Sequence, residues 1–147
     1  MIQRIQTVYI LLSAILIGLL FSLPFAEIAH HDQLFLFDVR GIVRNDTVQE
    51  NGLPLGLLIG LLLILHVYTL FIYKKRILQI RILVFSIILM IGLFGLFYFF
   101  TYYTFNDAQI SFKMGVIFPL VAVILDYLAI RNIGKDETLI RSADRIR

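Results

Sequence analysis

Four apolar stretches, each close to the length that crosses a lipid bilayer, take up more than half of this chain. They run over residues 7–24, 53–73, 82–103 and 115–130, with short polar segments between them. A helix that spans the hydrocarbon core needs about 20 predominantly apolar residues. A composition with 60% hydrophobic and 16% charged residues also lies outside the range of soluble domains. The pattern predicts an integral membrane protein with four transmembrane helices.

The first stretch has features of both a secretory signal and a retained anchor. Arg4 precedes it, but the apolar run over residues 8–23 exceeds the roughly 7–15 residues of a signal core, and no Ala-x-Ala triplet follows. We therefore expect a retained transmembrane helix.

The basic residues flank alternate stretches. Most of the 13 Lys and Arg residues fall in the N-terminal segment, in the loop between the second and third stretches, and in a basic tail over residues 131–147. Because short loops rich in Lys and Arg stay in the cytoplasm, we expect both termini there and the loops over residues 25–52 and 104–114 on the opposite, periplasmic side. Short connections make neighbouring helices antiparallel, so residues 1–147 should form a single all-α domain with up-down-up-down topology.

The first outer loop, residues 25–52, is long enough to have a fold of its own. β-Prone residues flank Gly41, and Asn45-Asp46 can supply a tight turn, which predicts a short β-hairpin. Phe35 and Phe37 lie in a run of four consecutive apolar residues, so both faces of this strand need cover. The cover can come from the membrane surface, from Phe105, Ile110 and Phe112 of the second outer loop, or from a partner protein, for which Phe35 and Phe37 are candidate contacts. The alternative is that the loop lies on the membrane surface and caps the bundle.

The tail over residues 131–147 becomes polar and basic. Gly134 is expected to end the fourth helix and Asp136 to begin a short amphipathic helix. Arg141 and Arg145 are candidate contacts for the inner leaflet or for a cytoplasmic partner. A solvated tail is the alternative.

Two ionisable residues lie within the apolar stretches, where charge is costly and usually functional. His66 precedes Lys74 by eight residues and Asp126 precedes Arg131 by five, so they lie roughly 12 Å and 7 Å inside the same membrane face at 1.5 Å per residue. His66 and Asp126 can form a hydrogen bond if the second and fourth helices are neighbours. Such a pair could move a proton or bind a ligand. It could also be structural, with Asp126 paired to Arg131 or Arg81 and His66 to a serine or a carbonyl.

The chain offers no recognisable catalytic, cofactor-binding or metal-binding set. It contains no cysteine, which excludes thiol nucleophiles and thiolate metal sites. Ser13, Ser22 and Ser86 lack a Gly-x-Ser-x-Gly setting, and the adjacent His30 and His31 would point to opposite faces of a strand. We therefore expect a protein that is not an enzyme and that uses no cofactor.

Two glycine pairs are candidates for close helix packing. Gly56 and Gly60 lie four residues apart in the second stretch, and Gly92 and Gly95 make a notch in the third. Small residues let helices approach closely in lipid, either within the bundle or against another membrane protein.

The two ends of the chain carry a family resemblance. Residues 1–12 read Met-Ile-Gln-Arg-Ile-Gln-Thr-Val-Tyr-Ile-Leu-Leu, and residues 140–147 read Ile-Arg-Ser-Ala-Asp-Arg-Ile-Arg, around four apolar stretches of this spacing. In these features the chain resembles an uncharacterised family of small Bacteroidetes inner-membrane proteins, the domain of unknown function 4293. The resemblance covers essentially the whole chain. It implies a bacterial inner membrane, cytoplasmic termini and no enzymatic residues.

These features predict a small non-enzymatic inner-membrane protein that acts as an accessory subunit of a larger membrane complex, such as protein export machinery. Its expected partners are the lipid bilayer and that complex. Nucleic acid is not expected, because the basic residues form no stripe with aromatic partners, and no small-molecule substrate is identified. The alternatives are a small transporter or proton-coupled carrier that uses His66 and Asp126, and a lone membrane anchor.

Overall fold

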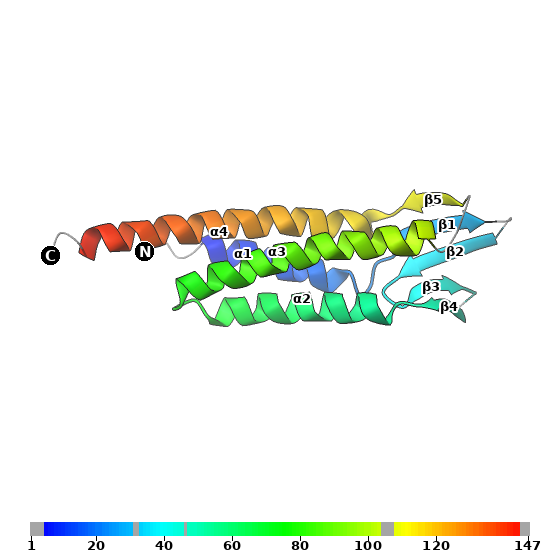
Figure 1. Ribbon diagram of the computed structural model, residues 1–147, viewed down its shortest axis with the longest axis horizontal. Coiled ribbons are helices and arrows are strands. Elements are labelled where there is room, and N and C mark those ends of the chain that lie inside the picture. The colour runs from blue at the N-terminus through cyan, green and yellow to red at the C-terminus, as the bar shows by residue number, and fades with distance from the viewer. Residues whose placement is uncertain (1–4, 31–32, 46, 104–107, 145–147) are drawn as a thin grey trace.

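The computed structural model describes residues 5–30, 33–45, 47–103 and 108–144, which form a helix bundle with a β-sheet at one end (Figure 1). Within these ranges the long helices are α1 (Ile5–Leu19), α2 (Leu53–Phe71), α3 (Arg76–Tyr98) and α4 (Ile117–Asp144). A π-helical turn, η1 (Phe99–Tyr103), extends α3, and a short 3-10 helix, η2 (Met114–Val116), leads into α4. α1 and α3 each pack against both α2 and α4, so α2 and α4 face each other across the diagonal of the bundle.

The sheet shows that the prediction of an all-α fold with one short hairpin was wrong. Its five antiparallel strands lie in the order β4-β3-β2-β1-β5. They are β1 (Ala26–His30), β2 (Gln33–Asp38), β3 (Gly41–Arg44), β4 (Thr47–Asn51) and β5 (Gln109–Phe112). The first outer loop supplies four strands, and β5 comes from the second outer loop and pairs with β1. A lone hairpin is marginal in water, whereas five strands on an apolar support form a stable layer.

The inner face of the sheet belongs to the hydrophobic core. Side chains alternate along β2, so Phe35 and Phe37 are buried, whereas Leu34 and Leu36 are 71% and 46% exposed. The rings around Phe37 are Phe25, Phe97 and Phe100, at centroid distances of 5.3, 5.9 and 5.5 Å. This aromatic cluster joins the sheet to the end of α3, because Phe97 and Phe100 lie in α3 and η1.

A close approach of backbones joins the sheet to α2. Gly41 follows the turn between β2 and β3 with a φ of +108°, and a Cβ atom there would collide with the carbonyl oxygen of Glu50. The amide of Gly52 donates to the carbonyl of Arg40 at 2.8 Å. Pro54 occupies the first turn of α2, where its missing N–H costs nothing. The β2–β3 turn therefore rests on the start of α2.

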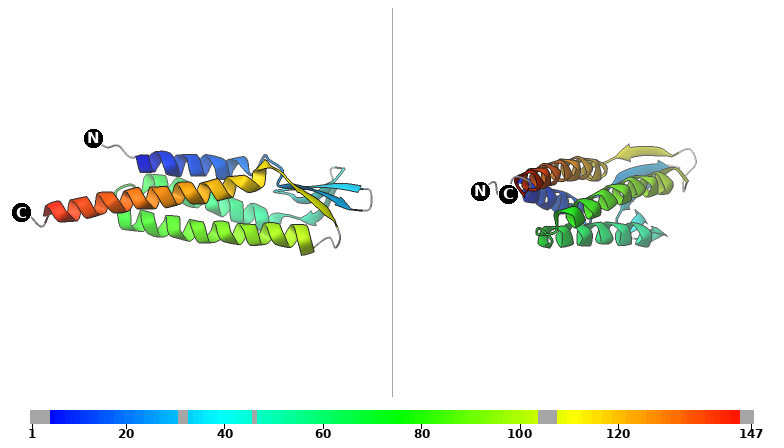
Figure 2. Two further views of the ribbon diagram at one scale, coloured as in Figure 1. Left: turned by 90° about the horizontal axis from the view of Figure 1, so that it is seen from above. Right: turned by 60° about the vertical axis from the view of Figure 1, so that its left-hand side comes forward.

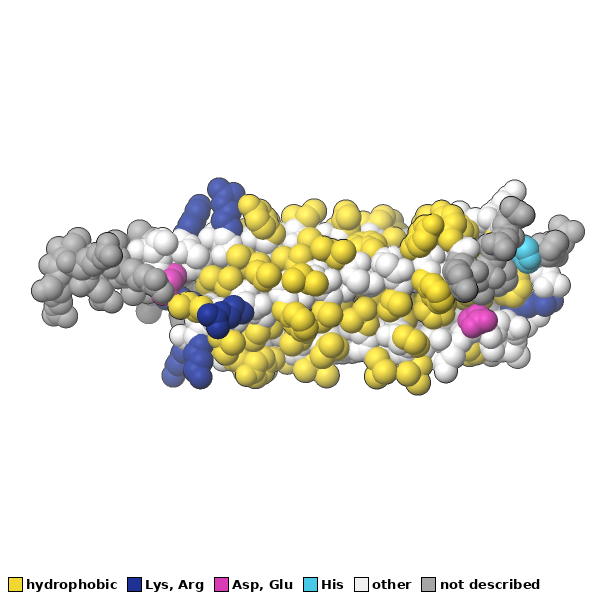
Figure 3. Space-filling view, in the orientation of Figure 1, with side chains coloured by type: hydrophobic (Ala, Val, Ile, Leu, Met, Phe, Trp, Pro, Cys, Tyr) yellow, Lys and Arg dark blue, Asp and Glu magenta, His cyan; other side chains and the backbone are white. Residues whose placement is uncertain are grey.

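The bundle buries several polar residues among apolar ones and exposes apolar side chains on its outside. Buried positions recur every three or four residues along each helix. They include Gln6, Ile10, Ser13 and Ile17 in α1, Leu62, His66 and Thr69 in α2, Gln79, Leu83, Ser86 and Met90 in α3, and Ala122, Asp126, Ala129 and Ile133 in α4. Large aliphatic side chains point outward and cover the helices on the face shown in Figure 3. Such a surface suits a bundle that is surrounded by lipid.

Three helical segments in the described part of the chain are long and apolar enough to cross a membrane. They are Leu53–Phe71, Arg76–Tyr102 and Met114–Thr138, whereas α1 is apolar but spans only 15 residues. The start of α1 and the C-terminal part of α4 lie at the end of the bundle that is opposite the sheet, where α4 projects beyond α1 and beyond the α2–α3 connection (Figures 1 and 2).

The fourth helix does not end where the sequence predicted. We expected Gly134 to terminate it and a separate segment to follow, but α4 continues through this glycine to Asp144. Ile133, which directly precedes Gly134, is fully buried in a cluster with Ile10 and Leu83, and beyond the glycine Glu137 forms an ion pair with Arg76 of α3 at 4.0 Å. The described part of the basic tail is therefore an extension of α4.

Candidate functional site

A polar cluster in the centre of the bundle joins three helices. Nε2 of His66 in α2 lies 2.9 Å from Oδ2 of Asp126 in α4 and 3.1 Å from Oγ of Ser13 in α1. Nδ1 of His66 lies 2.8 Å from the carbonyl oxygen of Leu62, one turn earlier in α2. Ser13, His66 and Asp126 are all 0% exposed. The two ionisable residues that the sequence singled out within its apolar stretches therefore meet across the diagonal of the bundle.

The contacts of His66 determine how many protons the cluster holds. A carbonyl oxygen only accepts, so Nδ1 carries a hydrogen and donates it to Leu62. Nε2 of His66 and Oδ2 of Asp126 lie 2.9 Å apart, and two lone pairs at this distance would repel each other. One of the two atoms must therefore carry a proton that it donates to the other. The pair is therefore an imidazolium with a carboxylate, or a neutral imidazole with a carboxylic acid. Both states have zero net charge, which avoids an unpaired charge in an apolar interior.

The contact forms although the two depths estimated from the sequence differ by several ångströms. The estimate for Asp126 took Arg131 as the end of the helix, whereas α4 continues to Asp144. In the described part of the chain, the ion pair of Asp126 is with His66 and not with Arg131 or Arg81. His66 also has the serine and carbonyl contacts that the structural alternative expected.

The cluster contains the residue types of a serine hydrolase triad but not its connectivity. In a triad, the serine bonds to one imidazole nitrogen and the carboxylate orients the ring through the other. Here Ser13 and Asp126 share Nε2 of His66, and a backbone carbonyl occupies Nδ1. Asp126 cannot hold the ring for attack by Ser13. The arrangement can store or exchange one proton, and it can fix the relative positions of three helices.

Ser13 is a partner that the sequence analysis did not assign. It lies between Ile10 and Ile17 on the inward face of α1, seven residues after the buried Gln6. Its Oγ also lies 3.5 Å from the carbonyl oxygen of Ala122, so it connects α1 to α4 as well as to α2. Polar residues spaced seven apart on otherwise apolar helices are the signal that could have found it.

The four glycines named as packing candidates do not bring helices of this bundle together. A Cβ atom at Gly60, Gly92 or Gly95 would meet nothing within 4 Å, and at Gly56 the nearest atom belongs to the side chain of Val39 at 3.6 Å. Gly60, Gly92 and Gly95 therefore leave open notches on the surfaces of α2 and α3, whereas Gly56 lies against Val39.

The candidate partner contacts also need correction. Phe35 and Phe37 were expected to face a partner, but both are buried in the core of this chain and present no surface to one. Leu34 and Leu36 occupy the exposed face of β2 instead. The backbone of Arg141 lies in α4, whereas its side chain lies outside the described residues, as does the whole of Arg145.

Among the described residues, no three His, Asp or Glu side chains are grouped so that they could hold a metal ion. His30 lies in β1, and its sequence neighbour His31 lies outside the described residues.

A protein-family model matches nearly the full length of the chain. Residues 2–146 match the family described as a domain of unknown function, DUF4293. The chain belongs to this family. The resemblance carried by its two ends is thereby confirmed. Neither the curated proteins nor the solved structures contain a match to this DUF4293 chain.

Proposed function

We propose that this protein is a non-enzymatic accessory subunit of a larger membrane complex, and that a transmembrane helix of a partner subunit packs along the outer part of α2. A groove between strand β4 and the first turns of α2 carries this proposal. Its volume is about 470 Å³, and its lining includes Val39, Val48, Asn51, Leu53, Gly56 and Leu57.

The groove is apolar and continues onto the lipid-facing surface of α2. Leu57 is 67% exposed, and Leu53 and Val48 are also exposed. Gly60 lies one turn beyond Gly56 and leaves the backbone of α2 open, whereas Gly56 lies against Val39 at the end of the groove. Helices associate in lipid where small residues permit close contact, so a partner helix fits this surface better than lipid tails do.

The sheet offers the partner a second contact just outside the membrane. β4 lies at one edge of the five-stranded sheet, and all five of its residues are exposed. The outward backbone groups of an edge strand can pair with an added strand. A partner chain that leaves the membrane at this groove would reach β4 directly.

The distribution of charge supports a bacterial inner-membrane location with cytoplasmic termini and a periplasmic sheet. The end opposite the sheet carries Lys74, Lys75, Arg76, Arg81, Arg131 and Lys135, and the sheet end carries Arg40, Arg44 and Lys113. Basic segments stay on the cytoplasmic side. Protein export machinery is our first candidate for the larger complex, because it is a membrane assembly of several subunits.

Crosslinking combined with affinity purification tests the subunit role. The tagged full-length chain, with a photo-reactive residue at Leu57, is purified from native membranes after illumination. We expect a stoichiometric companion that is crosslinked through one of its transmembrane helices. Gly60→Leu should prevent co-purification by filling the notch, whereas Gly92→Leu, at an equally open glycine of α3, should not. Recovery of the chain alone, or equal effects of both substitutions, would contradict the proposal.

A proton-coupled carrier is the second candidate, and the buried cluster around His66 favours it. One proton is shared between Nε2 of His66 and Asp126, and the pair lies between helices that could separate to admit water. This function requires that Asp126→Asn stop proton flux into liposomes that contain the purified protein. If liposomes that contain the unmodified protein show no more proton flux than empty liposomes, the carrier function is excluded.

A further inference from the structure

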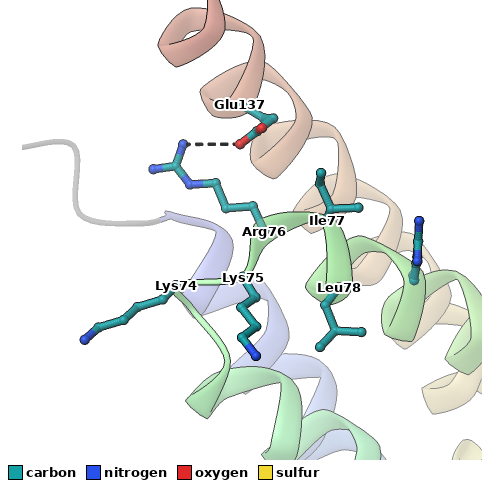
Figure 4. A pocket seen from close by; sticks show the side chains of 7 residues that line it. Lys74, Lys75, Arg76, Ile77, Leu78 and Glu137 are labelled. Atoms are coloured by element: carbon teal, nitrogen blue, oxygen red, sulfur yellow. Dashed lines mark ion pairs between the residues drawn. The ribbon is translucent and has the colours of Figure 1, made fainter. Parts of the chain in front are cut away.

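A cationic cavity lies at the end of the bundle opposite the sheet. It has a volume of about 630 Å³ and is formed by the α2–α3 connection, the first turns of α3 and one residue of α4. Its charged lining consists of Lys74, Lys75, Arg76, Arg81 and Glu137 (Figure 4). The lining contains four cations and one carboxylate, and of the labelled cations only Arg76 points toward Glu137, whereas Lys74 and Lys75 point away from it (Figure 4). The net positive charge of the lining suits an anion.

Arg76 has a donor that no group in the described part of the chain satisfies. Its Nη1 atom is shielded from solvent and has no hydrogen-bond partner there, although the Arg76 side chain as a whole is 29% exposed. The same atom forms only a long ion pair, at 4.0 Å, with Oε2 of Glu137 (Figure 4). A buried donor without an acceptor is costly. The planar guanidinium matches the oxygens of a phosphate group, so a bound phosphate would satisfy it.

The start of α3 adds a second attraction for an anion. α3 begins at Arg76 with Lys75 as its N-cap, no side chain caps it, and its first turn contains no acidic residue. The N-terminus of a helix carries partial positive charge, so Lys75 and Arg76 are cations at the end where anions are favoured. The first amides of a helix bind phosphate readily.

The position of the cavity selects a lipid as the source of the phosphate. It lies where the apolar surface of the helices ends, which is the level of phospholipid headgroups if α2 and α3 cross the bilayer (Figure 3). Ile77, which also lines the cavity, is exposed, and the exposed residues Val84, Ile88 and Ile91 continue its stripe along α3. An acyl chain can follow this stripe from a headgroup held in the cavity.

We propose that this cavity binds the phosphate of an anionic phospholipid, such as phosphatidylglycerol, with Arg76 as the principal ligand and an acyl chain along α3. Lys75 and Arg81 contribute charge, and the first amides of α3 contribute hydrogen bonds. Basic cavities between membrane helices are typical sites for anionic headgroups. This inference depends on the membrane insertion of α2 and α3 and is independent of any partner at β4.

Native mass spectrometry of the full-length protein tests the site. The protein is extracted in detergent with equal amounts of phosphatidylglycerol and phosphatidylcholine, and the lipids that remain bound are counted. We expect one phosphatidylglycerol per chain in preference to phosphatidylcholine. Arg76→Gln should weaken its retention by about fivefold, the effect of one cation at a membrane surface. Lys75→Gln should weaken it in the same direction and provides a second variant if Arg76→Gln does not fold.

The matched control is Arg131→Gln, which removes an exposed arginine of α4 outside the cavity. It should leave retention unchanged. Equal losses in Arg76→Gln and Arg131→Gln would show a general charge effect and overturn the site. Displacement of the lipid by millimolar inorganic phosphate would identify a free-anion site instead, and equal retention of both lipids would exclude headgroup recognition.

Discussion

Nε2 of His66 on α2 lies 2.9 Å from Oδ2 of Asp126 on α4, and both side chains are completely buried. The contact crosses the bundle between two helices whose main packing partners are α1 and α3. A shift of either helix along its axis would break this contact and leave the carboxyl group of Asp126 without its partner in an apolar interior, which is costly. His66 would keep its contact with the carbonyl oxygen of Leu62 in the same helix. The contact therefore sets the relative height and rotation of α2 and α4.

Breaking this pair from one side should cost more than replacing both residues. Asp126→Ala leaves the imidazole of His66 without its partner, and His66→Ala leaves the carboxyl group alone. Each is expected to lower the free energy of unfolding by about 3–5 kcal/mol. The double variant His66→Met with Asp126→Leu replaces the pair by apolar groups of similar size and should recover most of this loss. The measurement is reversible unfolding in mixed micelles, followed by circular dichroism. Additive losses in the double variant would contradict direct coupling.

Two buried serines should respond to alanine in opposite ways. Ser13→Ala removes one contact of His66, but Asp126 stays in place, so we expect a loss of about 0.5–1.5 kcal/mol. The Oγ of Ser86 is buried and has no hydrogen-bond partner in the described part of the chain. Ser86→Ala should therefore leave stability unchanged or raise it by up to about 1 kcal/mol. The same unfolding assay compares the two variants, and a larger loss for Ser86→Ala would show that its hydroxyl has a partner.

The helices and the central pair could be predicted because their signals are local. The second apolar stretch was placed at 53–73, and α2 covers Leu53–Phe71, since an apolar run of this length has few other structures in lipid. The depths of His66 and Asp126 could be compared by counting residues from the nearest charges. Which side of each helix faces inward was harder to predict, because the outward face is as apolar as the inward one. The polar residues Gln6 and Ser13, and likewise Gln79 and Ser86, mark the inward faces by their spacing of seven.

The sheet could not be predicted because it depends on pairing between distant segments. β5 has only four residues, Gln-Ile-Ser-Phe, and becomes a strand by pairing with β1, more than 70 residues earlier in the chain. The helices bring the two outer loops to the same end of the bundle, and this tertiary effect exceeds any local propensity of either segment. The continuation of α4 through Gly134 also involves a distant segment, since Glu137, beyond the glycine, pairs with Arg76 of α3, which a local preference of glycine for helix ends does not include.

Replacement of two neighbouring residues of β2 by alanine should change stability by very different amounts. Phe37→Ala opens a cavity in the aromatic cluster between the sheet and α3, and a loss of about 3–5 kcal/mol is expected. The sheet should also become sensitive to protease, because this cluster attaches it to the bundle. Leu36→Ala removes an exposed side chain from the same strand and should change stability by less than about 0.5 kcal/mol. Equal protease sensitivity in both variants would mean that Phe37 does not attach the sheet.

The sidedness of the chain can be measured directly, because it has no cysteine and single introduced thiols report without background. Gln49→Cys places a thiol on exposed β4, and Lys135→Cys places one on the exposed side of the α4 extension. In spheroplasts, a membrane-impermeant maleimide should label Gln49→Cys at once and Lys135→Cys only after lysis, since basic segments stay in the cytoplasm.

The opposite labelling pattern would reverse the orientation, and with it the leaflet whose lipids reach Arg76. It would also place β4 on the cytoplasmic side, so the partner strand proposed for this edge would have to come from a cytoplasmic segment. Labelling of both positions in intact spheroplasts would mean that the two ends of the bundle lie on one side of the membrane. The helices would then not span the bilayer, and neither the groove on α2 nor the cavity at α3 would have the surroundings that their proposed ligands require.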